Sequence, residues 1–203
     1  SAEFLQIRNN LLPYLKPHDL ARTKVVHQDI YPIDANWKLV VENFRECYHC
    51  LPSHPQYTQV NEYVRAAERD SDTYEAMVKK FAKVSERKGR QSGMGNFPLP
   101  IQPHYVWRIP IRDGYKTLTR DGSPAGPLLG EFEAYDGAVT GAFIGALSYL
   151  YAANYHATTF RFTPQSPELT EVAVSWLVRE DAREGLDYDI EHLKWMWDVT
   201  TVQ

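Results

Sequence analysis

Apolar and polar residues alternate with two different periods along the chain, and each period predicts its own kind of secondary structure. Apolar residues at helical spacing predict a helix that begins at residue 37 and buries one face: Trp37, Val40, Val41, Phe44 and Tyr48. In the second half, short apolar stretches between turn residues predict strands at 148–153, 157–163 and 171–178. We expect the last two strands to pair as a hairpin, because the segment Pro164-Gln165-Ser166-Pro167 between them is rich in turn residues.

The other predicted elements complete an α+β arrangement, with helices before and after an antiparallel sheet. In chain order they are a helix at 3–12, a strand at 22–30, a charged helix at 72–87, a loop at 89–103, strands at 105–111 and 115–119, and a final helix after residue 185. We expect Asp34 or Asn36 to cap the helix that begins at residue 37, and Asp187 or Asp189 to cap the last helix.

The composition is that of a single globular domain, which we expect to span residues 1–203. Hydrophobic residues make up 43% of the chain and charged residues 24%, and the formal net charge is −4. No basic field for nucleic acid is therefore expected. Residues 1–10 lack the apolar core of a signal peptide, so we expect a cytoplasmic protein.

The uncharged stretch 137–155 could be read as a membrane segment, because its glycines have the small-residue spacing of membrane helix contacts. Polar residues interrupt the apolar run, however, at Thr140, Ser148 and Asn154. A buried strand whose glycines leave room for a ligand or a neighbouring backbone explains the same pattern. We therefore expect a strand and no contact with a membrane.

The histidines and prolines in 42–55 indicate a metal site. His49 and His54 are five positions apart, and on a continuous helix their side chains would point about 140° away from each other. We therefore expect the helix to break between them, with Pro52 as the breaking residue. Pro55 disfavours helix at the residue before it, so His54 is expected to project from a non-helical corner back toward His49. The spacing alone is equally consistent with a structural pair of histidines.

Other chemical groups lie close to this pair in the sequence. Glu46 precedes His49 by three positions and is expected to share a helix face with it. Two neutral imidazoles that converge at a helix end are typical of half of a 2-His-1-carboxylate iron(II) site, which leaves positions open for dioxygen. The two cysteines, Cys47 and Cys50, are expected at the carboxyl end of the helix, where the dipole should raise their thiol pKa values and disfavour disulfide exchange.

Several short strings around the histidines resemble the iron-binding signature of Rieske non-haem iron oxygenases, in the catalytic domain of the aromatic-ring-hydroxylating type of alpha subunit. These strings are Asn36-Trp37-Lys38, Glu42-Asn43-Phe44, Glu46-Cys47-Tyr48-His49 and His54-Pro55. Glutamate at position 46 resembles the branch that acts on quaternary amines such as carnitine and glycine betaine. Weaker similarity extends through 160–178 and 197–200.

The resemblance implies roles for individual residues. His49 and His54 would bind a mononuclear iron(II), and Glu46, supported by Asn43, would relay electrons from the Rieske cluster of a neighbouring subunit. The third ligand is expected just past Gln203, with Asp198 as the fallback. Because the chain has two cysteines and no Cys-x-x-His pair, we expect the [2Fe-2S] Rieske cluster on a domain that this chain does not include.

The resemblance also implies a fold and an activity. The fold would be the helix-grip form, a curved antiparallel sheet around a long C-terminal helix. The activity would be that of an oxidoreductase, a monooxygenase or dioxygenase that uses dioxygen to hydroxylate or N-demethylate a small organic substrate. Electrons would come from a ferredoxin or reductase, and the full-length subunit would form a homotrimer.

Two other functions remain open at this point. A zinc-dependent hydrolase could use the same histidines, and a helix-grip protein could bind a small apolar ligand without catalysis. The substrate is also open: a cation–π cage or ordinary core packing equally explains the aromatic residues Tyr149, Tyr151 and Tyr155 with Trp107 or Phe143. Of the other histidines, His104 is the candidate for a substrate contact, and structural or surface roles are expected for His18, His27, His156 and His192.

Overall fold

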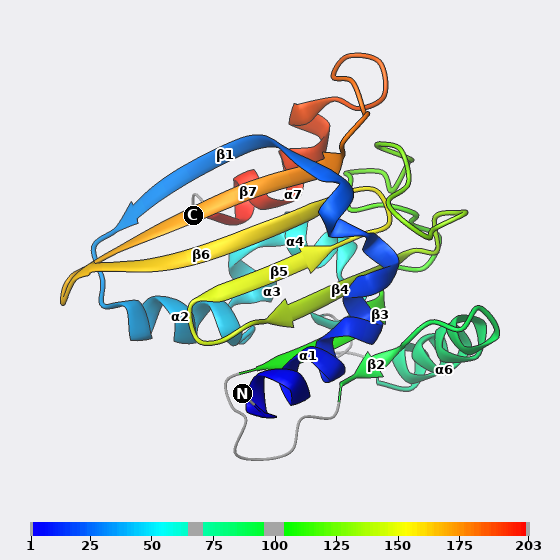
Figure 1. Cartoon of the computed structure of the whole chain (residues 1–203), viewed down its shortest axis with the longest axis horizontal. Coiled ribbons are helices and arrows are strands. Elements are labelled where there is room, and N and C mark those ends of the chain that lie inside the picture. Colours follow the sequence, from blue (N-terminus) through cyan, green and yellow to red (C-terminus); the bar gives the residue numbers. More distant parts are fainter. Residues whose placement is uncertain (1, 65–70, 96–103, 202–203) are drawn as a thin grey trace.

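A seven-stranded antiparallel sheet forms the centre of the computed structural model, which describes residues 2–64, 71–95 and 104–201 (Figure 1). The strands lie in the order β1-β7-β6-β5-β4-β3-β2, so β1 and β2 are the two edges. Their bounds are β1 Thr23–Ile33, β2 Gly93–Met94, β3 Tyr105–Pro110, β4 Ala138–Phe143, β5 Ser148–Ala152, β6 Ala157–Ser166 and β7 Leu169–Arg179.

Alternation along each strand gives the sheet two apolar faces. Tyr149 and Tyr151 of β5 join the larger core cluster on the inner face, whereas Leu150 and Ala152 between them join a smaller cluster on the outer face. The inner face carries most of the aromatic rings, and it faces the helices that hold the histidine motif. The sheet therefore supplies an aromatic floor for the candidate site.

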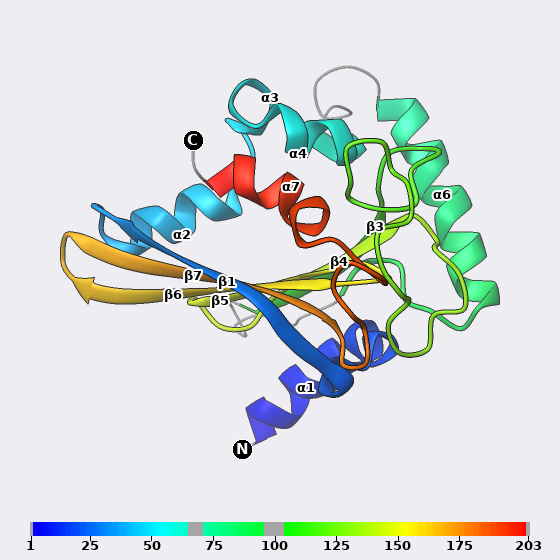
Figure 2. The ribbon, with the colours of Figure 1, turned by 90° about the horizontal axis from the view of Figure 1, so that it is seen from above.

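Helices cover both faces of the sheet unequally (Figure 2). Four lie over the inner face: α2 Trp37–Arg45, α3 Cys50–Ser53, α4 Pro55–Val60 and α7 Ile190–Thr201. On the outer face lies α1 Ala2–Leu15, which buries Leu11 and Tyr14 there. The remaining helix, α6 Ser71–Arg87, packs beside β3, and two 3-10 turns, η1 Lys16–His18 and η2 Leu20–Arg22, lead into β1.

Most of the predicted elements are present in the structure. The predicted helices at 3–12 and 72–87 correspond to α1 and α6, and the predicted hairpin is formed by β6 and β7, which pair antiparallel. Asn36 caps α2, since its side-chain oxygen accepts from the Lys38 amide at 3.0 Å, and Asp189 caps α7 through the His192 amide at 2.9 Å. The helix-grip prediction is confirmed in its essentials, with α7 crossing the inner face of the sheet.

Two predictions of secondary structure need correction or lie outside the described residues. Residues 115–119 are not a strand but an irregular segment that bends at 117–119, where the buried hydroxyls of Thr117 and Thr119 are hydrogen-bonded at 2.9 Å. Within the predicted loop at 89–103, the short strand β2 occupies Gly93–Met94, and residues 96–103 lie outside the described part of the chain.

The uncharged stretch 137–155 is in the sheet, as predicted, but it forms two strands, β4 and β5, rather than one, and both are almost entirely buried. Gly141 of β4 lies opposite Trp107 of β3, and a methyl group at position 141 would collide with the Trp107 indole. The glycine thus makes room for a neighbouring ring. In 2–64, 71–95 and 104–201, no helix has the length and apolar character that crossing a membrane requires.

Candidate metal centre

The candidate site begins where α2 ends. Glu46 has extended backbone angles (φ −93°, ψ 162°), so the helix stops at Arg45, earlier than predicted. The expected burial of Tyr48 on the helix stripe is wrong, because its side chain is 93% exposed. The cause is local: the Glu46 carboxylate accepts from the Tyr48 amide at 2.5 Å, which replaces the helical hydrogen bond of that amide.

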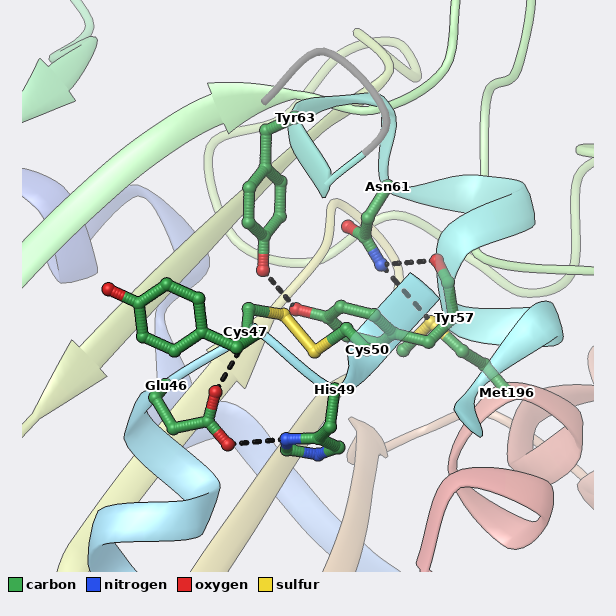
Figure 3. The surroundings of a disulfide bond; sticks show 9 residues. Glu46, Cys47, His49, Cys50, Tyr57, Asn61, Tyr63 and Met196 are labelled. Carbon is green, nitrogen blue, oxygen red and sulfur yellow. Dashed lines mark hydrogen bonds and ion pairs between the residues drawn. A yellow bond between two sulfur atoms is a disulfide. The ribbon is translucent and has the colours of Figure 1, made fainter. Parts of the chain in front are cut away.

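Glu46 and His49 meet even though they do not share a helix. Nδ1 of His49 lies 2.5 Å from Oε1 of Glu46, and both side chains are less than a third exposed (Figure 3). Burial alone would raise the pKa of Glu46, but the hydrogen bonds from His49 and from the Tyr48 amide outweigh it and hold the pKa below its usual value. The carboxylate therefore fixes the ring of His49 and leaves its Nε2 as the nitrogen available to a ligand.

His54 projects from a non-helical corner, as predicted. Its backbone angles (φ −125°, ψ 69°) separate α3 from α4, and Pro55 is the first residue of α4. The predicted break at Pro52 is wrong, since Pro52 lies within the first turn of α3, where a proline needs no amide hydrogen. Pro55, rather than Pro52, sets the corner from which His54 projects.

The two imidazoles converge. Their ring centroids lie 5.0 Å apart and the rings are nearly perpendicular. Nδ1 of His54 is buried and has no hydrogen-bond partner among the described residues. Burial, with a smaller effect of His49, lowers the pKa of His54, which favours the neutral form that binds metals.

A third ligand is not found near the histidines. Within the described part of the chain, no three His, Cys, Asp or Glu side chains are grouped so that they could hold a metal ion. The fallback acid, Asp198, is absent from the cavity lining and pairs with Lys194 at 3.5 Å, while Lys194 also reaches Asp29 at 3.4 Å. Burial raises the pKa of Asp198, although Lys194 opposes this effect. The residues present therefore fit two of the three positions of a facial iron site.

Cys47 and Cys50 form a disulfide that encloses Tyr48 and His49 (Figure 3). The expected position at the carboxyl end of a helix is confirmed for Cys47 but is wrong for Cys50. Cys47 follows the end of α2, and Cys50 is the first residue of α3, a helix of 4 residues. The bond ties together the turn on which Glu46 and His49 meet, which gives the two cysteines a structural role in the site.

A cavity of about 1010 Å³ opens beside the histidines, between the inner face of the sheet and the helices. His49, His54, Glu46 and Asn43 all contribute to its lining, so the four predicted site residues share one cavity. Most of the remaining lining is aromatic or apolar, including Phe44, Tyr57, Tyr63, Tyr105, Trp107, Phe143, Tyr149, Phe160 and Trp197.

The proposed aromatic cage is only partly present. Trp107, Phe143 and Tyr149 line the cavity, whereas Tyr151 is fully buried behind it and bonds to Asn61 at 2.6 Å. Tyr155 is outside the cavity, because β5 ends at Ala152 and the tyrosine turns away to accept from the Leu118 amide at 3.0 Å. Alternation along one strand therefore did not extend to all three tyrosines.

Arg45 places a cation in the same cavity. Its guanidinium lies 4.3 Å from the centre of the Phe143 ring and 5.9 Å from that of Tyr105, and it donates to the Gly145 carbonyl at 3.1 Å. The face of Phe143 is thus already covered by a positive charge. Sequence reasoning did not single out Arg45, although its position between two site residues, next to Glu46, is a signal that could have done so.

Two tyrosines of the lining were also missed. Tyr57 lies in the first turn of α4, three positions after His54, and Tyr63 follows in the helical residues 62–64. Their hydroxyls lie 2.5 Å apart (Figure 3). The short distance from His54 in the sequence was the available signal for Tyr57, but the contact with Tyr63 depends on the turn between the two helices.

The other histidines lie away from the cavity lining. His104 accepts from the Gly145 amide at 2.9 Å, so its role as a substrate contact stays a prediction without support from the cavity. His18 and His156 are fully buried, and burial lowers the pKa of each to about 3. His27 pairs with Asp29 at 2.9 Å.

Comparison with known proteins gives this geometry a context. Residues 20–119 match the family of the ring hydroxylating alpha subunit (catalytic domain). The chain is 33% identical over 202 residues to the glycine betaine monooxygenase oxygenase subunit of Chromohalobacter salexigens. That alignment covers 94% of this chain and 43% of the relative, so the chain spans less than half of the relative's length.

Solved structures share the fold. A quaternary ammonium Rieske monooxygenase in complex with an inhibitor superposes with a TM-score of 0.53 at 13% identity, covering 96% of this chain and 38% of that one. A second structure of such an enzyme, described for carnitine oxidation and inter-subunit electron transfer, gives 0.51 at 15% identity and covers 90% and 37%. At these identities the likeness concerns the arrangement of helices and strands.

Proposed function

Since the chain belongs to the family of ring hydroxylating alpha subunits (catalytic domain), we propose that it forms the mononuclear-iron domain of an oxygenase. The single domain would span residues 1–203, and the Rieske cluster would reside on another domain. The proposed activity is hydroxylation or N-demethylation of a small organic substrate with dioxygen. The observation that carries the proposal is the convergence of His49 and His54, 5.0 Å apart, on one large cavity.

His49 and His54 would hold the iron. The unpartnered, buried Nδ1 of His54 and the fixed ring of His49 are the donor set that this role requires. The third ligand would come from an acid beyond Gln203, since Asp198 is already paired with Lys194. Bound iron(II) with open positions would supply the activation of dioxygen.

Glu46 is proposed to have two tasks. Through Oε1 it orients His49, and as a charged group at the end of α2 it would relay electrons arriving from a Rieske cluster of a neighbouring subunit. Asn43, one turn earlier on α2 and exposed in the cavity lining, would support it. A homotrimer fed by a ferredoxin or reductase is the assembly implied by such a relay between subunits.

The substrate is proposed to be a small quaternary amine. The aromatic lining supports this choice, since cations bind on the faces of tryptophan and tyrosine rings. The Arg45 guanidinium covers Phe143, so a trimethylammonium group would use other rings, such as those of Trp107 and Tyr63, which lie 6.4 Å apart. The cation of Arg45 in the same cavity disfavours a substrate with a net positive charge and favours a zwitterion.

The test is iron binding by the full-length protein under anaerobic conditions. We expect one tightly bound ferrous ion per catalytic domain, and a loss of affinity of about a hundredfold or more in His49→Ala and in His54→Ala. His192→Ala, a histidine of α7 that lies away from the cavity lining, is the matched control and should bind iron normally.

The same measurement separates the alternatives. Full iron occupancy in either of the two cavity variants would refute the assignment of ligands. Zinc in place of iron in the protein as isolated would favour a hydrolase, and a retained apolar ligand without metal would favour a carrier.

A further inference from the structure

Beyond the metal ligands, the hydroxyl pair of Tyr57 and Tyr63 is the most unusual polar feature of the cavity. The two phenols meet at 2.5 Å, and both residues belong to the cavity lining (Figure 3). Each side chain carries one O–H group, and only one of the two hydrogens is needed for the bond between them. The second hydroxyl hydrogen has no acceptor among the described residues.

The contact between the hydroxyls is not needed to hold the two tyrosines in place. Asn61, between them in the chain, is 1% exposed and fully engaged in hydrogen bonds. Its side-chain amide donates to the Tyr57 carbonyl at 3.0 Å, and its side-chain oxygen accepts from the Tyr151 hydroxyl at 2.6 Å. The backbone amide of Asn61 reaches the same Tyr57 carbonyl at 2.9 Å. The turn that carries the tyrosines is thus fixed by Asn61.

Aromatic contacts hold the two rings as well. The Tyr57 ring lies 5.6 Å from that of Trp197 on α7, and the Tyr63 ring lies 6.4 Å from that of Trp107 on β3. Burial raises the pKa of Tyr57 well above its usual value and that of Tyr63 to about 12, so both phenols keep their hydrogens at neutral pH. The pair is a fixed, neutral hydrogen-bond donor in a largely apolar cavity.

We infer that the Tyr57–Tyr63 pair binds a carboxylate oxygen of the substrate and so orients the molecule relative to His49 and His54. The inference rests on the proposed function and adds to it the residues that would recognise the carboxylate of a zwitterionic quaternary amine. Donation to a charged acceptor is stronger than donation to a neutral one, so the pair would select for the carboxylate. Tyr57 is well placed for such a role, because it lies three positions after His54 on the helix that begins at that corner.

The test compares two ligands that differ in the carboxylate. Glycine betaine carries it, whereas tetramethylammonium presents only the cation. Affinities are measured by calorimetry on the full-length, iron-loaded protein under anaerobic conditions. The ratio of the two dissociation constants is the readout, because a loss of packing weakens both ligands and leaves the ratio unchanged.

In the double variant Tyr57→Phe/Tyr63→Phe we expect the preference for glycine betaine to fall by about tenfold or more, with little change for tetramethylammonium. Each single variant should lose less of this preference, because the hydroxyl that remains can still donate its hydrogen to the carboxylate. Tyr135→Phe is the control: it removes a tyrosine hydroxyl that donates to the Gly126 carbonyl outside the cavity lining, and it should keep the ratio of the wild type.

The outcomes separate this inference from the proposed function. If the wild-type protein binds neither ligand, the proposed substrate class is refuted and this inference with it. If it binds glycine betaine and the double variant keeps the preference, only the role of the tyrosine pair is refuted. Equal weakening of both ligands in the double variant, with a lowered melting temperature, would assign the hydroxyls a structural role and also refute the inference.

Discussion

A histidine on the outer face of the sheet and the two histidines of the candidate site on the inner face differ in how many of their ring nitrogens are hydrogen-bonded. On the outer face, His18 donates from Nδ1 to the Ala153 carbonyl and accepts at Nε2 from the Thr140 hydroxyl, both at 3.1 Å. On the inner face, His49 has one nitrogen bonded to Glu46, and Nδ1 of His54 has no partner among the described residues.

The outer face also carries a buried group of charges next to His18. Thr140 lies opposite Arg108 in the sheet, and Arg108 forms a buried ion pair with Asp136, whose carboxylate also lies 3.5 Å from Arg90. Burial there lowers the pKa of Arg108, an effect that Asp136 opposes. A histidine whose two nitrogens are both used contributes to stability, whereas one with a nitrogen to spare is available for a ligand. The spare nitrogen indicates function only beside the cavity, since the buried Nδ1 of His156 also has no partner in the described part of the chain but lies outside the cavity lining.

Of the variants that distinguish the two faces, Asp136→Ala on the outer face should cause the largest change, a decrease in the free energy of unfolding. The change leaves the Arg108 guanidinium, whose side chain is 4% exposed, without its partner, and we expect a loss of about 3–5 kcal/mol of unfolding free energy. Denaturant unfolding measures it. Asp181→Ala is the matched control, since its pair with Arg179 is on the surface and should contribute at most about 1 kcal/mol. Equal losses in the two variants would show that the outer-face pair is not a structural centre.

A smaller effect is expected from Glu46→Gln on the inner face. Glutamine can still accept from Nδ1 of His49, so the iron should stay, but the charge of the proposed relay is lost. We expect turnover by the full-length protein to fall by about 10- to 100-fold while iron content is unchanged. Glu42→Gln, an exposed acid one turn earlier on α2, should leave both quantities as in the wild type. Normal turnover in Glu46→Gln would remove the carboxylate charge from the mechanism.

Counted per pH unit, the smallest effect concerns the pH dependence of stability that His18 contributes. Burial holds the folded pKa of His18 at about 3, below the value near 6.5 expected when the chain unfolds. The unfolded state therefore takes up the proton first as the pH falls, so this contribution to stability is complete above about pH 6.5 and is lost toward pH 3. In His18→Gln the slope of unfolding free energy against pH between pH 4 and 6 should decrease by roughly 1.4 kcal/mol per pH unit. An unchanged slope would mean that His18 is protonated in the folded protein.

Sequence reasoning succeeded where the physical cause is local and periodic. The helix from Trp37, the capping by Asn36 and the β6–β7 hairpin each follow from short-range patterns, and all three are present. The corner at His54 follows from the restriction that Pro55 imposes on the residue before it.

It failed where a side chain competes with the backbone or where distant segments meet. The Glu46 carboxylate takes the Tyr48 amide and ends α2 early, which periodicity does not reveal. Pro52 was expected to break a helix, but a proline in the first turn is tolerated. The pair of Tyr57 and Tyr63 depends on a turn in which Asn61 accepts a hydrogen bond from Tyr151 of β5, a contact between residues far apart in the sequence.

Gly141 does not line the cavity, but it determines how much space is left for Trp107, which does. A methyl group at this position would meet the Trp107 indole, which itself lines the cavity. Gly141 therefore influences the shape of the cavity although it is not part of the lining, because its lack of a side chain leaves room for the indole. In an evolving lineage, small substitutions on β4 could move the indole and admit larger or smaller molecules while the iron ligands and the tyrosine pair stay as they are. The range of substrates that fit the cavity can therefore change without a change in the residues that carry out the reaction. Positions such as Gly141, next to the lining but not part of it, are suitable first targets for directed evolution of specificity.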